Sequence, residues 1–183
     1  LCLGYSLTWE NDTKSLQNLM VNILEDKVLF CERKRIHITH DQWNVKNQLP
    51  SILITDKGAE YTGQTFEQIT ELGVTLINLP PYRPELKSII EKFFDLIQNS
   101  YKDALKGKGV IMPDFQERGA HDYRKDAVLT MQEFERILLR CIIHYNCERV
   151  IQNYPYTDEM LSDNVSPHAN EIWNWKIDRS ETN

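Results

Sequence analysis

The stretch ILITDKGAEYTG, residues 52–63, decides the fold class of this chain. Its apolar run is too short for a helix and predicts a buried strand over residues 51–55 that ends at Asp56. Lys57 and Gly58 break the strand. Ligands and metals gather at the carboxyl ends of strands in α/β sheets, so Asp56 is a candidate functional residue.

Strands and helices alternate on both sides of this stretch. Downstream, we expect a short helix over residues 65–72, closed by a glycine, a strand over 74–79, and a long helix that begins after Pro84. Upstream, residues 1–9 alternate with period two and predict a strand, and the apolar residues between 16 and 28 are spaced as one face of a helix. This order predicts an α/β layered domain.

The C-terminal half carries one strong helix signal. Thr130 and Glu133 form a capping-box pattern, and the apolar residues from 131 to 145 follow with helical spacing. Residues 111–128 are polar with little periodicity, and residues 153–183 are rich in turn formers. We therefore expect a single long helix in this half, with irregular structure on both sides of it.

Composition excludes several classes of protein. The 183 residues are 41% hydrophobic and 26% charged, which argues against a fully disordered chain, and no apolar run is long enough for a membrane span. The net charge of −6 excludes a strongly basic nucleic-acid binder, although residues 32–46 and 83–108 are locally basic. The four cysteines form no CxxC pair, which argues against a structural zinc cluster and favours a cytoplasmic location.

Asp56 and Glu91 are the candidate chemical pair. Thirty-four residues lie between them, and a helix, a strand and a proline-rich turn can return the chain to the end of the first strand. Two converging carboxylates repel each other unless a hard cation such as Mg²⁺ or Mn²⁺ joins them. Two such ions can activate an attacking oxygen and stabilise a leaving one in phosphodiester transfer. The alternative is a capped strand end and a solvated helical glutamate.

Four segments together resemble the DDE transposase and retroviral-type integrase superfamily. They are ILITDKGAEYTG, then LGVTLINLPPYRPELKSIIEKFF at 72–94, YNCER at 145–149, and SPHANEIWNW at 166–175. The last of these resembles the region after the core in TnsB/TniA-type bacterial transposases, which are relatives of the phage Mu transposase. Ser88 departs from the glycine usual in that family.

The resemblance implies an RNase-H-like catalytic core over residues 1–161, a mixed sheet flanked by helices, with residues 162–183 as a linker or the start of a following domain. It implies that Asp56 and Glu91 hold two Mg²⁺ or Mn²⁺ ions for cleavage of DNA 3′ ends and strand transfer. The first catalytic aspartate of the family sits on a strand before LCLGYSLTWE, residues 1–10, so we expect this chain to lack it and to be inactive alone.

The resemblance also implies partners. These are transposon-end and target DNA, further copies of the chain on DNA, an AAA+ ATPase regulator and companion transposition proteins in a bacterial cytoplasm. Five side chains near the expected metals could hold DNA phosphates, or else pack or stay solvated: Lys57, Tyr82, Arg83, Lys87 and Lys92. Two other functions stay open, namely a non-catalytic DNA-binding or assembly module of the same fold, and a nuclease that only hydrolyses.

Overall fold

The chain forms a mixed α/β structure with a small parallel sheet. The computed structural model describes residues 1–9, 13–45, 47–55, 64–78, 88–112, 116, 118–119 and 121–180. Its elements are α1 (Thr13–Leu24), α2 (Lys27–Arg33), β1 (Ile52–Thr55), α3 (Gln64–Glu71), β2 (Thr75–Asn78), α4 (Ser88–Lys102), the 3₁₀ helix η4 (Tyr123–Asp126), α5 (Met131–Cys147), α6 (Asp158–Ser162) and α7 (Ala169–Ser180). The strand–helix–strand–helix order from β1 to α4 confirms the predicted alternation.

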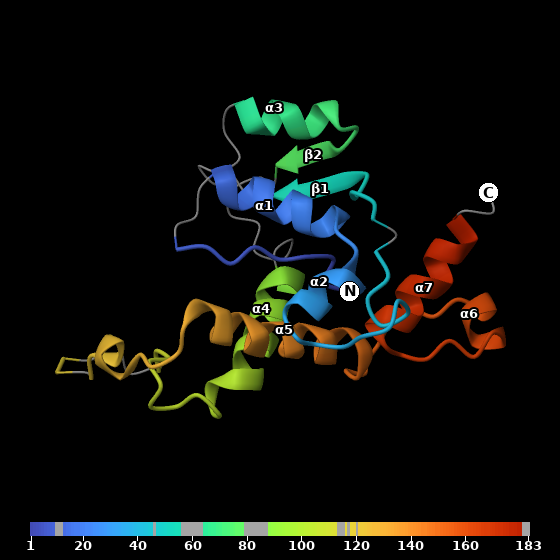
Figure 1. The fold of residues 1–183 in the computed structure, drawn as a ribbon. Coiled ribbons are helices and arrows are strands. Elements are labelled where there is room, and N and C mark those ends of the chain that lie inside the picture. The colour runs from blue at the N-terminus through green and yellow to red at the C-terminus, as the bar shows by residue number, and fades with distance from the viewer. Residues whose placement is uncertain are drawn as a thin grey trace.

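The sheet part of the molecule consists of α1, β1, α3 and β2, stacked in the upper half of Figure 1. β1 and β2 pair in parallel, with Leu53 opposite Leu76. These two side chains pack against a buried cluster from α1, α3 and the turn before β2: Leu16, Met20, Ile23, Ile69 and Val74. Gly73 ends α3 with a φ of 82°, as expected for the residue that closes a helix.

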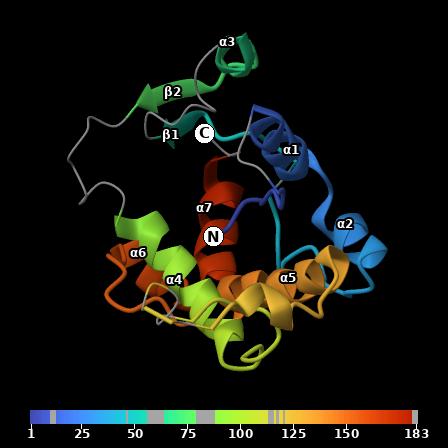
Figure 2. The ribbon, with the colours of Figure 1, turned by 90° about the vertical axis from the view of Figure 1, so that its left-hand side faces the viewer.

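The helical part consists of α2, α4 and α5 with the loop 34–49. Its buried cluster draws on all four segments: Phe30, Cys31, Ile36, Trp43, Val45, Ile97, Leu139 and Ile142. The predicted capping box of α5 is confirmed, because Thr130 Oγ1 accepts the Glu133 N–H at 3.2 Å and Glu133 Oε2 accepts the Thr130 N–H at 2.8 Å. Figure 2 shows α4 and α5 side by side below the sheet.

Residues 1–9 join the two parts and are not a strand, which corrects the sequence prediction. The segment makes its backbone hydrogen bonds with side chains rather than with a strand neighbour: Asn146 Oδ1 accepts the Cys2 N–H at 2.9 Å, and Asn22 Oδ1 accepts the Tyr5 N–H at 3.0 Å. Leu3 packs against both buried clusters. A Cβ at Gly4 would lie 2.8 Å from the Ile23 side chain, so this close approach requires glycine.

The predicted continuous helix over residues 16–28 is also wrong. α1 ends at Leu24, and Asp26 begins α2 by accepting the Leu29 N–H at 2.9 Å. The buried Lys27 donates from Nζ to the carbonyls of Asn22 and Ile23 at the end of α1. An aspartate cap and a lysine that binds the last carbonyls stabilise a break that apolar spacing alone cannot reveal.

β1 is buried on one face only, which corrects the expectation of a fully buried strand. Ile52 and Ile54 are 52% and 57% exposed, and Ile77 on β2 is 43% exposed. Alternate side chains of a strand point to opposite faces, and α1 and α3 pack against the Leu53 face. The predicted apolar stripe of α4 is narrower as well, because Ile90 and Phe94 are more than half exposed.

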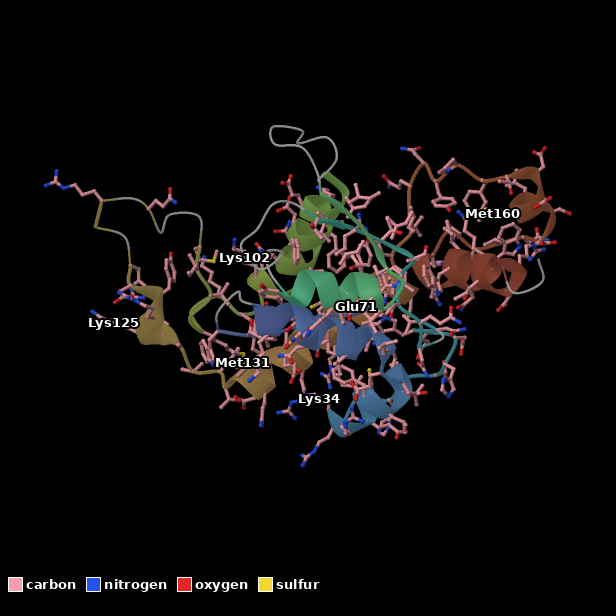
Figure 3. The ribbon with its side chains drawn as sticks, turned by 90° about the horizontal axis from the view of Figure 1, so that it is seen from above. Lys34, Glu71, Lys102, Lys125, Met131 and Met160 are labelled. Carbon is pink, nitrogen blue, oxygen red and sulfur yellow. The ribbon has the colours of Figure 1, made fainter. Side chains whose placement is uncertain are left out.

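Residues 153–183 contain α6 and α7, where the sequence predicted turns. α7 packs against α5, and Asn170 and Asn174 donate from Nδ2 to the Asp41 carbonyl in the loop 34–49. Ala169 and Ile172, which are spaced as one face of a helix, are buried in α7, so the correction is to the predicted turns. The domain boundary after residue 161 stays a prediction. In Figure 3, Lys125 on the η4 excursion and Met160 in α6 lie at opposite ends of the molecule.

No helix among the described residues is both long enough and apolar enough to cross a membrane.

Candidate functional site

The predicted site divides between described and undescribed residues. Glu91 and Lys92 lie on α4 and are both exposed. Five of the predicted residues lie outside the described ranges: Asp56, Lys57, Tyr82, Arg83 and Lys87. The predicted convergence of Asp56 and Glu91 therefore stays a prediction, and the structure informs it through the elements that lead to each carboxylate.

β1 leads directly to Asp56. Its last residue, Thr55, is 5% exposed and pairs in register with Asn78 at the end of β2. Because the strands are parallel, their carboxyl ends meet at one edge of the sheet, where the chain leaves β1 for Asp56. Asp56, the carboxylate predicted from the sequence, thus directly follows Thr55, a residue whose position is fixed by burial and by pairing with β2.

Glu91 lies in the first turn of α4. Its carboxylate is exposed, and no described residue forms an ion pair or a hydrogen bond with it. Negative charge in a first turn interacts favourably with the helix dipole. Asp95, one turn further along, is also exposed and adds a second negative charge on this side of α4. Among the described residues, none therefore competes with a ligand from solvent for Glu91.

Two aromatic contacts hold α4 against α5. The rings of Phe93 and Tyr145 meet edge to face with centroids 4.8 Å apart, and those of Tyr101 and Phe134 meet at 5.4 Å. The pairing is antiparallel, since the start of α4 contacts the end of α5. Between them Ile97 is only 4% exposed. Burial raises the pKa of the Tyr145 and Tyr101 hydroxyls. The helix that carries Glu91 is thus held at both ends.

Asn146, next to Tyr145, is fully buried and anchors the N-terminal segment. Its Oδ1 accepts the Cys2 N–H at 2.9 Å, and its Nδ2 donates to the Cys2 carbonyl at 3.4 Å. Trp43 Nε1 donates to the same carbonyl at 2.6 Å. The segment YNCER contains Asn146, but its resemblance to the family motif indicates no role for this residue. One signal was available, because this asparagine lies one turn beyond Ile142 on the apolar side of the helix.

The donor chemistry at Glu91 fits a hard divalent cation, because an exposed carboxylate is an oxygen ligand of the kind that Mg²⁺ binds. Within the described ranges, no group of three or more His, Cys, Asp or Glu side chains could hold a metal ion. Glu91 alone is not a metal site, and a site here requires Asp56 and at least one further group.

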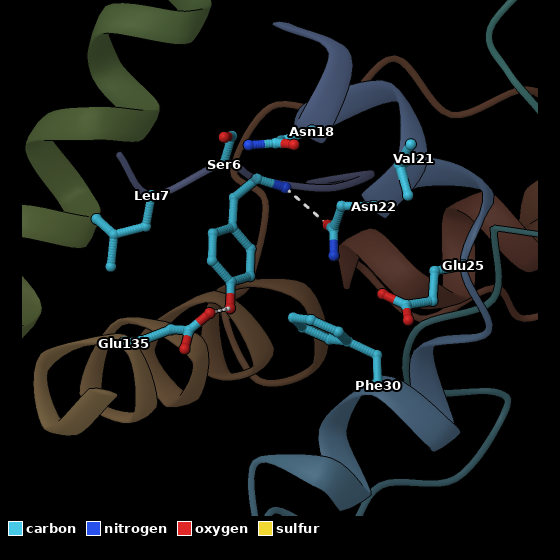
Figure 4. Close-up of a pocket in the computed structure, with 9 residues that line it drawn as sticks. Ser6, Leu7, Asn18, Val21, Asn22, Glu25, Phe30 and Glu135 are labelled. Atoms are coloured by element: carbon cyan, nitrogen blue, oxygen red, sulfur yellow. Dashed lines mark hydrogen bonds between the residues drawn. The ribbon is translucent and has the colours of Figure 1, made fainter. Parts of the chain in front are cut away.

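One small pocket lies beside the N-terminal segment, at residues 5–7 (Figure 4). Its volume is about 230 Å³, and residues from that segment, α1, α2 and α5 line it. Tyr5 is one of the lining residues, with its hydroxyl 3.1 Å from Glu135 Oε1, and burial of Tyr5 raises its pKa. Glu135 also forms an ion pair with Lys34 at 2.6 Å. None of the predicted site residues lines this pocket, and its carboxylates already have cationic or hydroxyl partners.

The fold and site define an α/β protein that places one candidate carboxylate after a parallel strand and another on a helix braced against its neighbour. Residues 1–107 match the family model for the TnsB C-terminal domain, so the chain belongs to the TnsB C-terminal domain family. It is also similar to the transposon Tn7 transposition protein TnsB of Escherichia coli, with 28% identity over 173 residues. That match covers 94% of this chain and 24% of the relative, so the chain spans about a quarter of that protein's length.

Proposed function

We propose that this chain is the RNase-H-like catalytic core of a DDE-type DNA transposase, and that it takes part in Mg²⁺-dependent cleavage of DNA 3′ ends and in strand transfer. The observation that supports this most is Glu91, which is exposed in the first turn of a helix fixed by its packing and has no partner among the described residues, in a chain that belongs to the TnsB C-terminal domain family. The strand–helix–strand–helix order from β1 to α4 supports the same fold.

Asp56 and Glu91 would hold the divalent ions. When bound, such ions stabilise the attacking and leaving oxygens of a phosphodiester displacement. The role of the chain's own residues is to orient the two carboxylates and to keep them accessible to DNA. Burial and pairing of Thr55 support the orienting role at Asp56, and the Phe93–Tyr145 contact supports it at Glu91.

Basic residues near the carboxylates would position the DNA backbone. Lys92 follows Glu91 on α4 and is exposed, as a phosphate contact requires. We propose the same role for the other four predicted residues: Lys57, Tyr82, Arg83 and Lys87. The DNA partners would be transposon ends and target DNA, with further copies of the chain, an AAA+ ATPase regulator and companion transposition proteins assembled on them.

The test is to compare Glu91→Gln and Asp56→Asn with the unmodified full-length protein. Each substitution keeps side-chain size and removes one negative charge. We expect loss of both 3′-end cleavage and strand transfer, by a factor of at least about 10², with DNA binding in Ca²⁺ unchanged or slightly tighter. Asp95→Asn is the matched control, because it removes an exposed charge from the same helix one turn away.

The alternatives give different results. A non-catalytic DNA-binding or assembly module would show wild-type transposition, or equal loss of binding, with the Glu91 and Asp56 variants. A nuclease of the same fold would cut DNA in Mg²⁺ without joining the 3′ end to a target. Loss of DNA binding in either variant would indicate a structural role for that carboxylate.

A further inference from the structure

Tyr145 and Asn146 connect three segments that are far apart in the sequence. Tyr145 contacts Phe93 on α4 at 4.8 Å between ring centroids, and Asn146 holds both backbone polar groups of Cys2, which is 144 residues away in the chain. Of these two neighbouring residues of α5, Tyr145 thus contacts the helix that carries Glu91, and Asn146 binds the N-terminal segment.

Of the two described ring contacts between α4 and α5, the Phe93–Tyr145 contact lies nearer to Glu91. Phe93 is two residues beyond Glu91, about 3 Å along the helix axis, whereas Tyr101 is ten residues beyond it, about 15 Å away. Of the described side chains between Glu91 and Ile97, Phe94 is 55% exposed, and Ile90 on the preceding side is 52% exposed. Among the described side chains close to Glu91, Phe93 is therefore the one whose ring contact ties the start of α4 to α5.

The Asn146 contact extends this support to the sheet part. Cys2 is held by Asn146 and by Trp43, and the next residue, Leu3, packs against the cluster that also contacts Leu53 on β1. A continuous set of contacts thus runs from the start of α4, through the end of α5 and the N-terminal segment, to the strand that ends before Asp56.

We propose that Tyr145 and Asn146 are positioning residues for the metal-binding carboxylates, with Tyr145 fixing the start of α4 so that Glu91 keeps its orientation relative to β1. The inference rests on the proposed function. Metal ligands need support within roughly 0.5 Å, so loosening the first turn of α4 should weaken metal binding without removing any ligand. The ring contact, rather than the hydroxyl, carries the effect.

Tyr145→Leu in the full-length protein tests this inference. We expect Mn²⁺ affinity on bound DNA, followed by the EPR signal of free Mn²⁺, to fall roughly tenfold, as is usual when support behind a metal ligand is lost. The Mg²⁺ concentration for half-maximal cleavage should rise by a similar factor. Tyr145→Phe keeps the ring and should restore both values to those of the unmodified protein.

Tyr101→Leu is the matched control. It removes the same type of edge-to-face contact between the same two helices, from a tyrosine that is likewise half-buried, but at the far end of α4. It should lower the melting temperature as Tyr145→Leu does and leave the metal dependence unchanged. If Tyr145→Leu does not fold, Phe93→Leu removes the same contact from the other side and should give the same shift in metal affinity.

The outcomes separate this inference from the proposed function. Unchanged Mn²⁺ affinity in Tyr145→Leu or Phe93→Leu, with Glu91→Gln inactive, overturns the positioning role and leaves the proposed function standing. An equal shift in Tyr101→Leu also overturns it, because a general loss of stability would then explain the effect. Wild-type activity in Glu91→Gln overturns the proposed function, and this inference with it.

Discussion

The helical part and the sheet part each lead to one predicted carboxylate, but they are built differently. In the helical part, Leu139 is completely buried, and α4 is held to α5 at both ends by aromatic contacts. In the sheet part, two strands of four residues have one face covered and one face exposed. The comparison teaches that the helix carrying Glu91 is fixed by packing, whereas the strand that ends before Asp56 has an outer face with no cover among the described residues.

The largest expected effect on stability comes from comparing the buried side of α5 with the exposed face of β1. Leu139→Ala should lower the free energy of unfolding by about 3 kcal/mol, because it removes a fully buried side chain and leaves a cavity. Ile54→Thr on the exposed face of β1 keeps a β-branched residue and should change that free energy by at most about 0.5 kcal/mol. Urea denaturation measures both.

A loss above about 1.5 kcal/mol for Ile54→Thr would show that something covers the outer face of the sheet, because exposed substitutions rarely reach that size. Equal losses for the two variants would remove the contrast between the helical part and the sheet part.

The next largest loss of stability is expected at the two asparagines that bind the backbone of the N-terminal segment. Asn146→Ala removes the acceptor of the Cys2 N–H and should cost about 2 kcal/mol, because this N–H then has no partner in a partly buried position, while the Cys2 carbonyl keeps the Trp43 Nε1 donor. Asn22→Ala removes one hydrogen bond, to the Tyr5 N–H, and should cost about 1 kcal/mol. Thermal unfolding of the two variants would check the order, and a larger loss for Asn22→Ala would show that the segment belongs mainly to the sheet part.

The smallest effect concerns Lys27, which lies where the two parts meet. Its ammonium donates to carbonyls at the end of α1 and lies 5.5 Å from the centre of the Trp43 ring. Burial lowers the pKa of Lys27 from its ordinary 10.5 to about 8. The unfolded chain then binds more protons than the folded one between these values, so stability should rise as pH increases from 8.

Cysteines limit that rise. Burial raises the pKa of Cys2 and Cys31 from 9 to about 11, so above pH 9 the folded chain holds protons that the unfolded chain loses, and stability should fall. The expected maximum therefore lies near pH 9. Lys27→Met should abolish the rise between pH 8 and 9 in urea denaturation series and keep the fall above pH 9. A rise that persists in this variant would assign it to another group.

Local sequence signals predicted part of this fold well. The capping box at Thr130 and Glu133 predicted the start of α5, and Gly73 predicted the end of α3, because each signal acts within one turn of chain. The apolar run before Asp56 predicted β1 for a similar reason. The exposed position of Glu91 also followed from helical spacing, which set it apart from the buried Ile97.

Other predictions depended on partners that the local sequence does not specify. Residues 1–9 alternate like a strand, but their backbone groups bind Asn146 and Asn22 instead of a neighbouring strand. The break between α1 and α2 depends on Lys27 reaching the end of the preceding helix. The helix α7 is stabilised by contact with α5 and with Asp41, which periodicity does not report.

The sequence by itself determined the order of strands and helices, the family resemblance and the choice of Asp56 and Glu91, because these depend on residue type, spacing and local capping. Only the tertiary structure decided that Tyr145 meets Phe93 and that Asn146 meets Cys2. Such contacts depend on how α5 packs against two segments distant in the chain, and no local pattern encodes that packing. The orientation of Glu91 is therefore a property of the folded chain, while its identity as a candidate is a property of the sequence.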